Sequence, residues 1–406
     1  MSPNTTKFVS GRLKEARDAR GIPTLITLAS LLNVNTSSVS RWEDGQSVPS
    51  GEKLLDLAEK LNLRPSYFLR PMFNHGDGPV FFRSLASARK RDIGRQRARL
   101  RWLQEISIVI QHYIDLPELD TPDLLHGESY QTLRDEDIER IAEELRIYWK
   151  LGSDPVANVV DLIERHGFFV GADEMGTTAL DGLCNWSSFN SRPYIMLAKD
   201  KMSFFRRQMD AAHEMSHAIL HKGVSDEALK QDFDLIEAQA FRLASAFLMP
   251  AKAFALAVRV PTLSRLMVLK DHWHVSIKAM IRRCKDLALV SPEEERQLYK
   301  YYSAKGWSKE EPLDRTVPVA SPRMLGQALG LIVSSGIRTK EELLANEFTV
   351  KAHDVESLLC LDDGWFSKKT GQLFNFEWTE GRKRGEQFEP GEVVSFAQMI
   401  PRRKAD

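Results

Sequence analysis

The sequence of 406 residues has little cysteine and no long apolar run. Its three cysteines, Cys184, Cys284 and Cys360, lie far apart and form no CxxC pair, which argues against disulfides and against a metal held by thiolates. No stretch approaches the about eighteen consecutive apolar residues that a membrane helix needs. The opening MSPNTTKFVSGRLKEARD carries charges where a signal peptide has its apolar centre. We therefore expect no membrane segment and a cytoplasmic location.

The chain carries no net charge, because 56 Lys and Arg residues balance 56 Asp and Glu residues. The two signs are unevenly distributed along it. Through Arg101, 18 basic residues stand against 9 acidic residues, and the remaining 38 basic residues stand against 47 acidic ones. A basic front part on an acidic body predicts a polyanionic partner at one end only.

The composition is that of an ordinary globular protein, with 43% hydrophobic and 28% charged residues. At roughly 100–200 residues per domain, the length predicts several domains. Helical periodicity dominates, while the short runs FFVGA and RPYIML flank the turn-rich DEMGTTALDG and predict a small sheet. The predicted fold class is therefore mainly α with a small β-sheet (α+β).

Turn-forming and polar segments divide the chain into four predicted parts. These are an N-terminal domain of five-helix type (1–70), a linker with an arginine-rich helix (71–134), a large domain (135–312) and a small C-terminal domain (313–406). In the large domain we expect helices at 203–221, 233–259 and 262–287. The last part is expected to hold a helical pair within 321–361, a short β-hairpin in WFSKKTGQLFNFEW and a basic patch, GRKRGE, and to sense a signal or bind a partner.

A five-residue pattern, HEMSH, carries metal chemistry. His213 and His217 are four residues apart in AAHEMSHAIL, so on a helix both imidazoles lie on one face and can reach a single metal ion. Glu214 lies between them, close enough for its carboxylate to act on a water molecule at the same site. This combination is what zinc hydrolysis requires, because zinc is the Lewis acid and the carboxylate takes the proton as water attacks a carbonyl.

The third ligand is expected from a neighbouring helix. Glu237 lies 20 residues beyond His217, and two histidines with one glutamate leave a coordination position open for water. Asp232 and Asp234 are rival ligands, but they are expected to precede this helix. The buried face of the helix is predicted from Leu235, Ala238, Phe241, Ala244 and Leu248.

A plainer alternative remains open for the histidines themselves. His213 and His217 could be ordinary hydrogen-bonded side chains near a helix surface, because short motifs also occur by chance. His221, one further helical turn along, is expected to support the site or to end the helix rather than to ligate metal.

These segments resemble the ImmA/IrrE family of metallopeptidases. That family pairs a helix reading roughly RFTLAHELGHLLLH with one reading E-x-Q-A-N-R-F-A-A-x-L-L-x-P, and this chain has RQMDAAHEMSHAILH followed by EAQAFRLASAFLMP. The resemblance covers about residues 135–312 and implies a zincin-like zinc peptidase, with His213, His217 and Glu237 as ligands and Glu214 as the general base. Phe241 stands where the family usually has Asn, so a polar group that could orient a histidine is missing.

A second pattern, LASLLNVNTSSVSRWEDGQSVP (28–49), is typical of a helix-turn-helix. Val39 and Trp42 are spaced to bury a second helix against a first one, which presents the N-terminal face of the second helix to a DNA major groove. Asn33 suits the left-handed turn between them, and Asn35 is the expected helix cap. The alternative is an ordinary helical hairpin.

This pattern closely resembles the Cro/C1-type family, also called XRE, in which LA-x4-V-x4-I-S-x-W-E-x-G-x3-P recurs. The resemblance covers about residues 8–70. It implies a double-stranded DNA operator as partner and a homodimer that reads paired half-sites. By position, the side chains that would face DNA are Thr36, Ser37, Ser38, Ser40 and Arg41.

An arginine-rich stretch follows, in which eight basic residues between Arg83 and Arg101 stand against Asp92 alone. Such a stretch can neutralise several phosphates and make DNA binding steeply dependent on salt. The alternative is a solvated helix that pairs with acidic side chains of the large domain, namely Glu136, Glu139, Glu143 and Glu144. The candidate DNA-backbone contacts are Arg89, Arg91, Arg95, Arg97 and Arg99.

The two resemblances together predict a DNA-binding transcriptional regulator fused to a zinc endopeptidase. The peptidase family is implied to cleave repressors of stress-response genes, prophages and mobile elements, so the expected substrate is a repressor protein or this chain itself. Defence genes are a further expected target. Two alternatives stay open: a non-enzymatic repressor whose zinc domain senses a ligand, which Phe241 favours, and a toxin-like peptidase whose DNA binding serves autoregulation.

Overall fold

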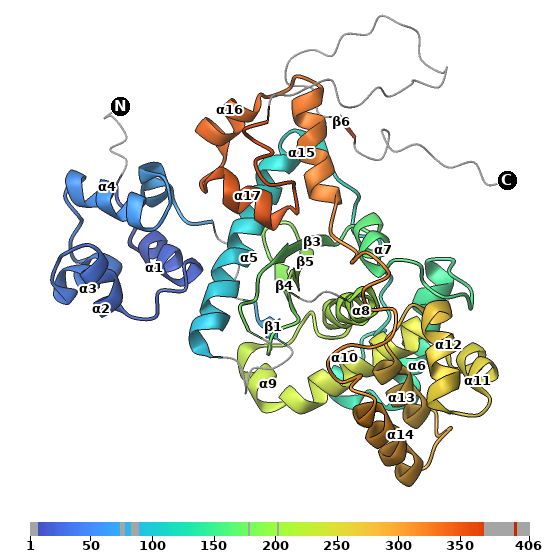
Figure 1. Ribbon diagram of the computed structural model, residues 1–406. Coiled ribbons are helices and arrows are strands. Elements are labelled where there is room, and N and C mark those ends of the chain that lie inside the picture. Colours follow the sequence, from blue (N-terminus) through green and yellow to red (C-terminus); the bar gives the residue numbers. More distant parts are fainter. Residues whose placement is uncertain are drawn as a thin grey trace, which may run out of the picture. The chain divides into compact units, whose positions relative to one another are not determined.

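The structure is a computed structural model that describes residues 7–73, 78–82, 89–177, 179–200, 203–368 and 394–395. The described chain is mainly helical with a small mixed sheet, which confirms the predicted fold class (Figure 1). Its internal contacts divide it into two compact units. Unit 1 comprises residues 1–75, 89–117 and 323–406, and unit 2 comprises residues 76–88 and 118–322.

The N-terminal part of unit 1 is a small helical bundle around an apolar core. Its elements are α1 (Ser10–Ala19), α2 (Leu25–Leu31), α3 (Thr36–Glu43), α4 (Gly51–Lys60) and a 3₁₀ helix, η1 (Pro65–Leu69). The Thr24 and Ser50 hydroxyls accept hydrogen bonds from backbone N–H groups of the first turns of α2 and α4, which caps both helices.

The turn between α2 and α3 has the predicted geometry. Asn33 adopts a φ of 50°, in the left-handed region that asparagine tolerates. Val39 and Trp42 are buried, and the Nε atom of Arg17 on α1 donates to Glu43 of α3 at 2.7 Å. Asn35 does occupy the position before α3, but its side chain makes no capping hydrogen bond there, so that part of the expectation is wrong.

The rest of unit 1 is built around one long helix. This helix and the later elements of the unit are α5 (Lys90–Gln111), β2 (Ile114–Asp115), α15 (Met324–Ser334), α16 (Lys340–Glu342), η3 (Leu343–Glu347), α17 (Ala352–Leu358) and β6 (Val394–Ser395). Helix α5 packs against α1, α15 and α17, and β2 pairs with β6 in parallel. The predicted C-terminal helical pair is thus present as α15 and α17.

Buried ion pairs link these elements of unit 1. The guanidinium of Arg12 on α1 lies 2.6 Å from a carboxylate oxygen of Glu105 on α5. Asp354 on α17 accepts from Arg20 of α1 at 2.7 Å and from Arg99 of α5 at 2.9 Å. Burial would raise the pKa of Asp354, but the two guanidinium groups outweigh burial and lower it. Each buried charge therefore has a partner, and removing one member of a pair would leave an uncompensated charge between these helices.

Unit 2 contains a four-stranded sheet in the order β1-β4-β5-β3. Its strands are β1 (Val80–Phe82), β3 (Phe169–Asp173), β4 (Gly182–Ser187) and β5 (Arg192–Ala198). Strand β4 runs antiparallel to both β1 and β5, while β3 and β5 are parallel. Strands β3 and β5 are those predicted from FFVGA and RPYIML, whereas no sequence pattern predicts β1.

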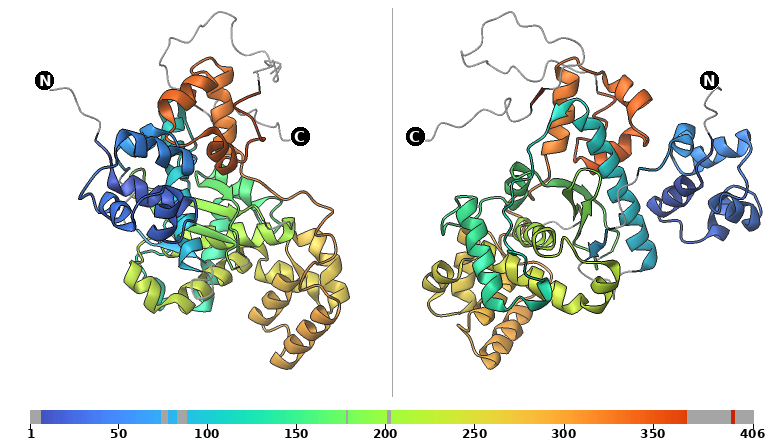
Figure 2. Two further views of the ribbon diagram at one scale, coloured as in Figure 1. Left: turned by 60° about the vertical axis from the view of Figure 1, so that its left-hand side comes forward. Right: turned by 180° about the vertical axis from the view of Figure 1, so that it is seen from behind.

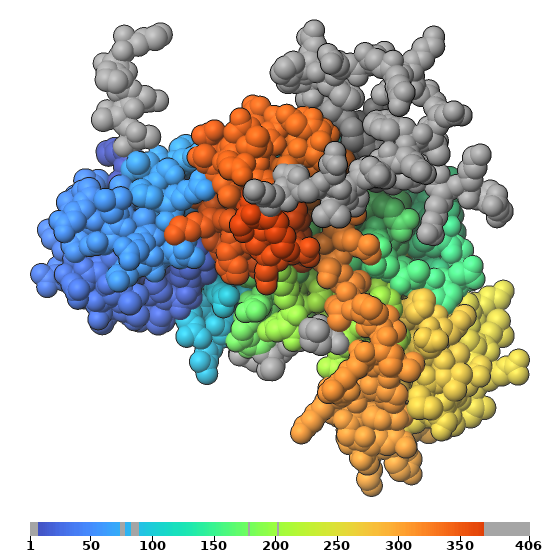
Figure 3. Space-filling view, turned by 45° about the horizontal axis from the view of Figure 1, so that its top comes forward, coloured from blue at the N-terminus to red at the C-terminus, as the bar shows by residue number. Residues whose placement is uncertain are grey.

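The other elements of unit 2 are helices. They are η2 (Tyr130–Thr132), α6 (Asp135–Tyr148), α7 (Val159–Arg165), α8 (Phe204–Leu220), α9 (Asp226–Gln231), α10 (Phe233–Leu248), α11 (Ala251–Val258), α12 (Leu263–Trp273), α13 (Ile277–Asp286) and α14 (Pro292–Ala304). Helix α8 lies against β4 and β5, and α10 packs on α8 and α6 (Figure 2). Figure 3 shows α11 to α14, in yellow to orange, as a lobe of this unit.

Two helices that the sequence predicts as continuous are interrupted. The stretch 233–259 breaks between α10 and α11 at Pro250, which cannot donate a helical N–H bond. The stretch 262–287 breaks between α12 and α13, where His274 takes a left-handed φ of 56°. The residues expected to form the C-terminal β-hairpin and the basic patch lie largely or wholly outside the described residues.

Over the described ranges, no single helix combines the length and apolar character needed to cross a membrane. By length and composition alone, the pair α10 and α11 would qualify together, but it bends by 68°.

Candidate functional site

Helices α8 and α10 bring three ligand-type side chains into one cluster, which we call the metal cluster: His213, His217 and Glu237. The Nε2 atoms of the two histidines lie 3.1 Å apart. The carboxylate oxygens of Glu237 lie 3.1 Å from Nε2 of His217 and 3.4 Å from Nε2 of His213. All three side chains are buried, and their ligand atoms lie within 4.8 Å of one another.

The chemistry of this cluster is compatible with a bound metal ion. Burial would raise the pKa of Glu237, but the imidazoles of His213 and His217 outweigh burial and hold that pKa at about 2. The carboxylate is therefore ionised at neutral pH. No side chain of the described chain donates a hydrogen bond of good geometry to either of its oxygens, as expected of a carboxylate that ligates a cation.

A chain of hydrogen bonds orients His217. Its Nδ1 lies 3.1 Å from Nδ1 of His221, and Nε2 of His221 lies 3.1 Å from the side-chain oxygen of Gln239. Because that oxygen only accepts, His221 carries its proton on Nε2 and accepts from Nδ1 of His217. Burial, followed by the neighbouring His217, lowers the pKa of His221 to about 3, so it stays neutral. His217 is thus left with a free lone pair on Nε2, directed at the metal cluster.

His221 therefore supports the metal cluster. This is one of the two roles expected for it, the other being to end the helix. The role of Gln239 was not predicted from the sequence. A signal was present, because Gln239 lies two residues after Glu237 and matches the Q of the E-x-Q pattern. Its amide nitrogen donates to the backbone carbonyl of Tyr130 at 2.6 Å, which fixes the orientation of its oxygen toward His221.

Glu214 is buried on α8 and faces strand β4. A Cβ atom added at Gly182 would lie only 2.8 Å from Oε1 of Glu214, closer than such atoms come in proteins. Glycine at position 182 therefore makes room for this carboxylate. Burial, with a smaller contribution from the charge of Glu214, raises the pKa of Cys184 well above its usual value, so this thiol stays protonated.

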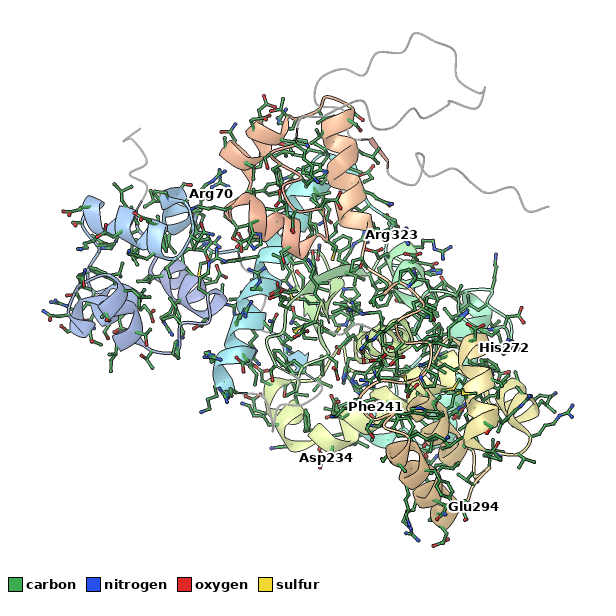
Figure 4. All side chains as sticks on the ribbon, viewed as in Figure 1. Arg70, Asp234, Phe241, His272, Glu294 and Arg323 are labelled. Carbon is green, nitrogen blue, oxygen red and sulfur yellow. The ribbon has the colours of Figure 1, made fainter. Side chains whose placement is uncertain are left out.

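The rival ligands do not join the cluster. Asp232 accepts from the Tyr130 hydroxyl and from Gln131, each at 2.7 Å. Asp234 is exposed on the first turn of α10, so the expectation that it precedes the helix is wrong. Figure 4 shows Asp234 near the start of α10 and Phe241 about two turns further along.

Phe241 lies against the metal cluster. Its ring centroid is 4.3 Å from that of His213, so an apolar ring occupies the position where the resemblance leads one to expect a polar group. The predicted buried face of α10 is also partly wrong. Leu235 and Ala238 are exposed, and the buried face instead follows Ile236, Glu237, Ala240, Leu243, Ala244 and Phe247.

Strand β1 covers the other side of the cluster. The ring of Phe81 stacks on His217, with centroids 4.8 Å apart and planes 13° apart, and lies 5.9 Å from the ring of His221. Phe81 is 1% exposed. Sequence reasoning missed this residue, because nothing in a three-residue apolar strand indicates which distant histidine it will contact.

The helix-turn-helix presents a polar surface on α3. Thr36, Ser37 and Arg41 are exposed, and Ser38 and Ser40 are partly exposed. The Ser40 hydroxyl donates to Asp44 at 3.2 Å, and Nε of Arg41 donates to the backbone carbonyl of Ser37 at 3.3 Å. The five side chains predicted to face DNA therefore all belong to the first two turns of α3.

The arginines of α5, and Arg89 directly before it, differ in their surroundings. Arg89, Arg91 and Arg97 are exposed and Arg95 is partly exposed. Arg99 is buried and ion-paired with Asp354, a contact that removes its charge from the surface. Among the acidic side chains expected to pair with this stretch, Glu139 instead binds Arg242 and Arg283 within unit 2, and Glu144 binds Arg140.

Comparison with known protein families confirms both resemblances. Residues 13–68 match the helix-turn-helix family, and residues 163–285 match a peptidase family described as the IrrE N-terminal-like domain. No curated protein matches the chain. The chain therefore joins a helix-turn-helix DNA-binding domain to an IrrE/ImmA-like, protease-like domain.

Proposed function

We propose that this protein is a cytoplasmic, sequence-specific transcriptional regulator with a zinc-dependent endopeptidase domain. The observation that carries the proposal is the metal cluster with Glu214 beside it, in a chain that also has a helix-turn-helix domain. We assign DNA binding to residues 1–70 and peptide hydrolysis to residues 135–312. The expected substrate is a repressor protein, or a second copy of this chain, whose cleavage changes the expression of stress, prophage, mobile-element or defence genes.

The donor set and its spacing favour zinc. Ligand atoms about 2.0–2.2 Å from a tetrahedral zinc ion lie about 3.3–3.6 Å apart, close to the 3.1 to 3.4 Å separations in this cluster. His213, His217 and Glu237 would hold the ion. When bound, zinc supplies Lewis acidity that polarises a peptide carbonyl and lowers the pKa of water.

Glu214 is the proposed catalytic residue. Its carboxylate accepts a proton from the attacking water and passes it to the leaving amine, as a general base and then a general acid. The surrounding residues prepare this step. Gly182 leaves space for the carboxylate, and the hydrogen bonds through His221 and Gln239 keep His217 in the tautomer that binds metal.

One observation favours a second function. Phe241 packs its ring on His213, in place of a polar group that would orient that histidine. In this alternative the domain binds zinc but cleaves nothing, and the protein is a repressor that senses a ligand through the metal cluster.

The proposal is tested by incubating the zinc-loaded protein with reduced casein and identifying new N-termini by mass spectrometry. We expect new termini that disappear when a chelator removes the metal and return when zinc is added back. Absence of new termini, both with and without DNA, would contradict the peptidase function and leave the sensing repressor.

DNA binding is proposed to use Thr36, Ser37, Ser38, Ser40 and Arg41 of α3, with two copies of the chain reading paired half-sites. Exposed arginines of α5 would contact phosphates, and the buried Arg99 takes no part in this. Replacing Arg89, Arg91 and Arg97 by alanine should reduce the slope of log K against log salt by about 0.9 for each phosphate that the variant no longer neutralises.

The measurement is fluorescence anisotropy of a labelled duplex at several salt concentrations. A matched control replaces three exposed basic residues at α14, Arg296, Lys300 and Lys305, and should leave the slope unchanged. An equal slope in the α5 variant and the wild-type protein would identify the stretch as solvated surface.

A further inference from the structure

We propose that the edge of β4 beside the metal cluster is a docking edge for extended peptides with an aromatic side chain, and that the chain's own β1 is its built-in occupant. A substrate must then displace β1 to reach Glu214. This inference rests on the proposed function in one respect, which is that the peptide docked at this edge is the peptide that is cleaved.

The backbone of β1 already pairs as an added strand would. Val80, Phe81 and Phe82 lie opposite Asn185, Cys184 and Leu183 in antiparallel register. The ladder therefore ends one residue from Gly182, whose Cα faces the Glu214 carboxylate. Adding a strand to a sheet edge is a common way of binding extended peptides, because main-chain hydrogen bonds supply affinity without specifying sequence.

The side chains of β1 lie on both faces of the sheet at this edge. Neighbouring residues of a strand point to opposite faces, so Phe81 stacks on His217 while Phe82 is buried on the other face of the sheet. Because the Phe81 ring stacks flat on His217, we expect the position opposite Cys184 to accept an aromatic side chain. A peptide with an aromatic residue at this register would replace one ring by another.

Asn185 binds the two residues that precede β1. Its amide nitrogen donates to the backbone carbonyls of Gly78 and Pro79, at 3.1 and 3.0 Å. Contacts to carbonyl oxygens suit any extended peptide, since every residue offers the same acceptor. Asn185 thus recognises main chain, whereas the ring of His217 recognises the aromatic side chain.

The site is closed while β1 is docked. His213, Glu214 and His217 are each no more than 1% exposed in this arrangement. The residues on both sides of β1 in the sequence, up to 75 and from 89 onward, belong to unit 1, which carries the helix-turn-helix. Release of β1 is therefore a step on which the DNA-binding unit can act through the chain itself.

The test follows hydrogen–deuterium exchange of residues 182–187 in the full chain, together with casein cleavage. Phe81→Ala and Asn185→Ala are expected to raise exchange of β4, because each weakens the docking of β1. Phe81→Ala, which removes a group of β1 but leaves Asn185 available to the substrate, is expected to raise the cleavage rate about 2- to 10-fold, as the loss of one ring contact implies. Tyr301→Ala, at an exposed aromatic position of α14, is the matched control and should resemble the wild-type protein.

A capped peptide with the sequence of residues 78–82, GPVFF, is the probe for the docking edge. It should restore the protection of β4 in Phe81→Ala and inhibit cleavage, whereas GPVAF, which lacks the ring of Phe81, should do neither. Unchanged exchange in both variants, or cleavage by Phe81→Ala no faster than wild type, would overturn the inference. If no protein cleaves casein but GPVFF still restores protection, the docking edge stands and the proposed peptidase function fails.

Discussion

Replacing His217 by alanine is expected to reduce bound zinc from about one ion per chain to nearly none. The Nε2 atom of His217 lies 3.1 Å from both other members of the metal cluster, so its loss removes one of only three protein ligands. The two remaining ligands would leave zinc too weakly held to survive dialysis. Elemental analysis of the dialysed protein measures this directly, beside the wild-type protein.

The control for this variant is His126→Ala. His126 is exposed and contacts Glu144, so its loss should leave the zinc content unchanged. His221→Ala should fall between the two, with zinc affinity lowered about 10- to 100-fold, since this residue orients a ligand without binding metal. Full zinc content in His217→Ala would show that the metal lies elsewhere and would remove the basis of the peptidase proposal.

Local sequence spacing predicts the residues that the metal cluster brings together. The i, i+4 relation of His213 and His217 follows from helix geometry alone, and a glutamate on a later apolar helix is the natural partner. The helix-turn-helix is predictable for the same reason, because Val39, Trp42 and the turn at Asn33 are all local features. Such patterns depend on residues within a few turns of each other.

Features that depend on distant pairing are not predictable in this way. Phe81 and His217 are far apart in sequence, and a three-residue strand has no period that could assign its partner. Arg99 illustrates the same limit, because its charge suggests phosphate contact until Asp354 of a remote helix is found beside it. The break between α10 and α11, by contrast, has a local signal, because Pro250 is visible in the sequence. The prediction of one continuous helix gave more weight to the apolar periodicity that runs through both helices.

Replacing Glu214 by glutamine is expected to slow casein cleavage about 10²- to 10⁴-fold while the protein keeps its zinc. Glutamine has nearly the same shape, so it should fit beside Gly182, but its amide cannot take a proton from water at neutral pH. Zinc content should not change, because Glu214 is not among the three clustered ligands. Steady-state cleavage rates and elemental analysis of the same preparation separate chemistry from metal binding.

A second variant tests the position of the carboxylate rather than its charge. A methyl group at residue 182 would meet Oε1 of Glu214 at 2.8 Å, so Gly182→Ala should displace the carboxylate and lower the cleavage rate about 10²-fold, with zinc retained. Glu227→Gln, at an exposed position of α9, is the matched control and should cleave as fast as the wild-type protein. If Glu214→Gln cleaves at the wild-type rate, Glu214 is not the base, and the buried carboxylate serves the packing of β4 on α8.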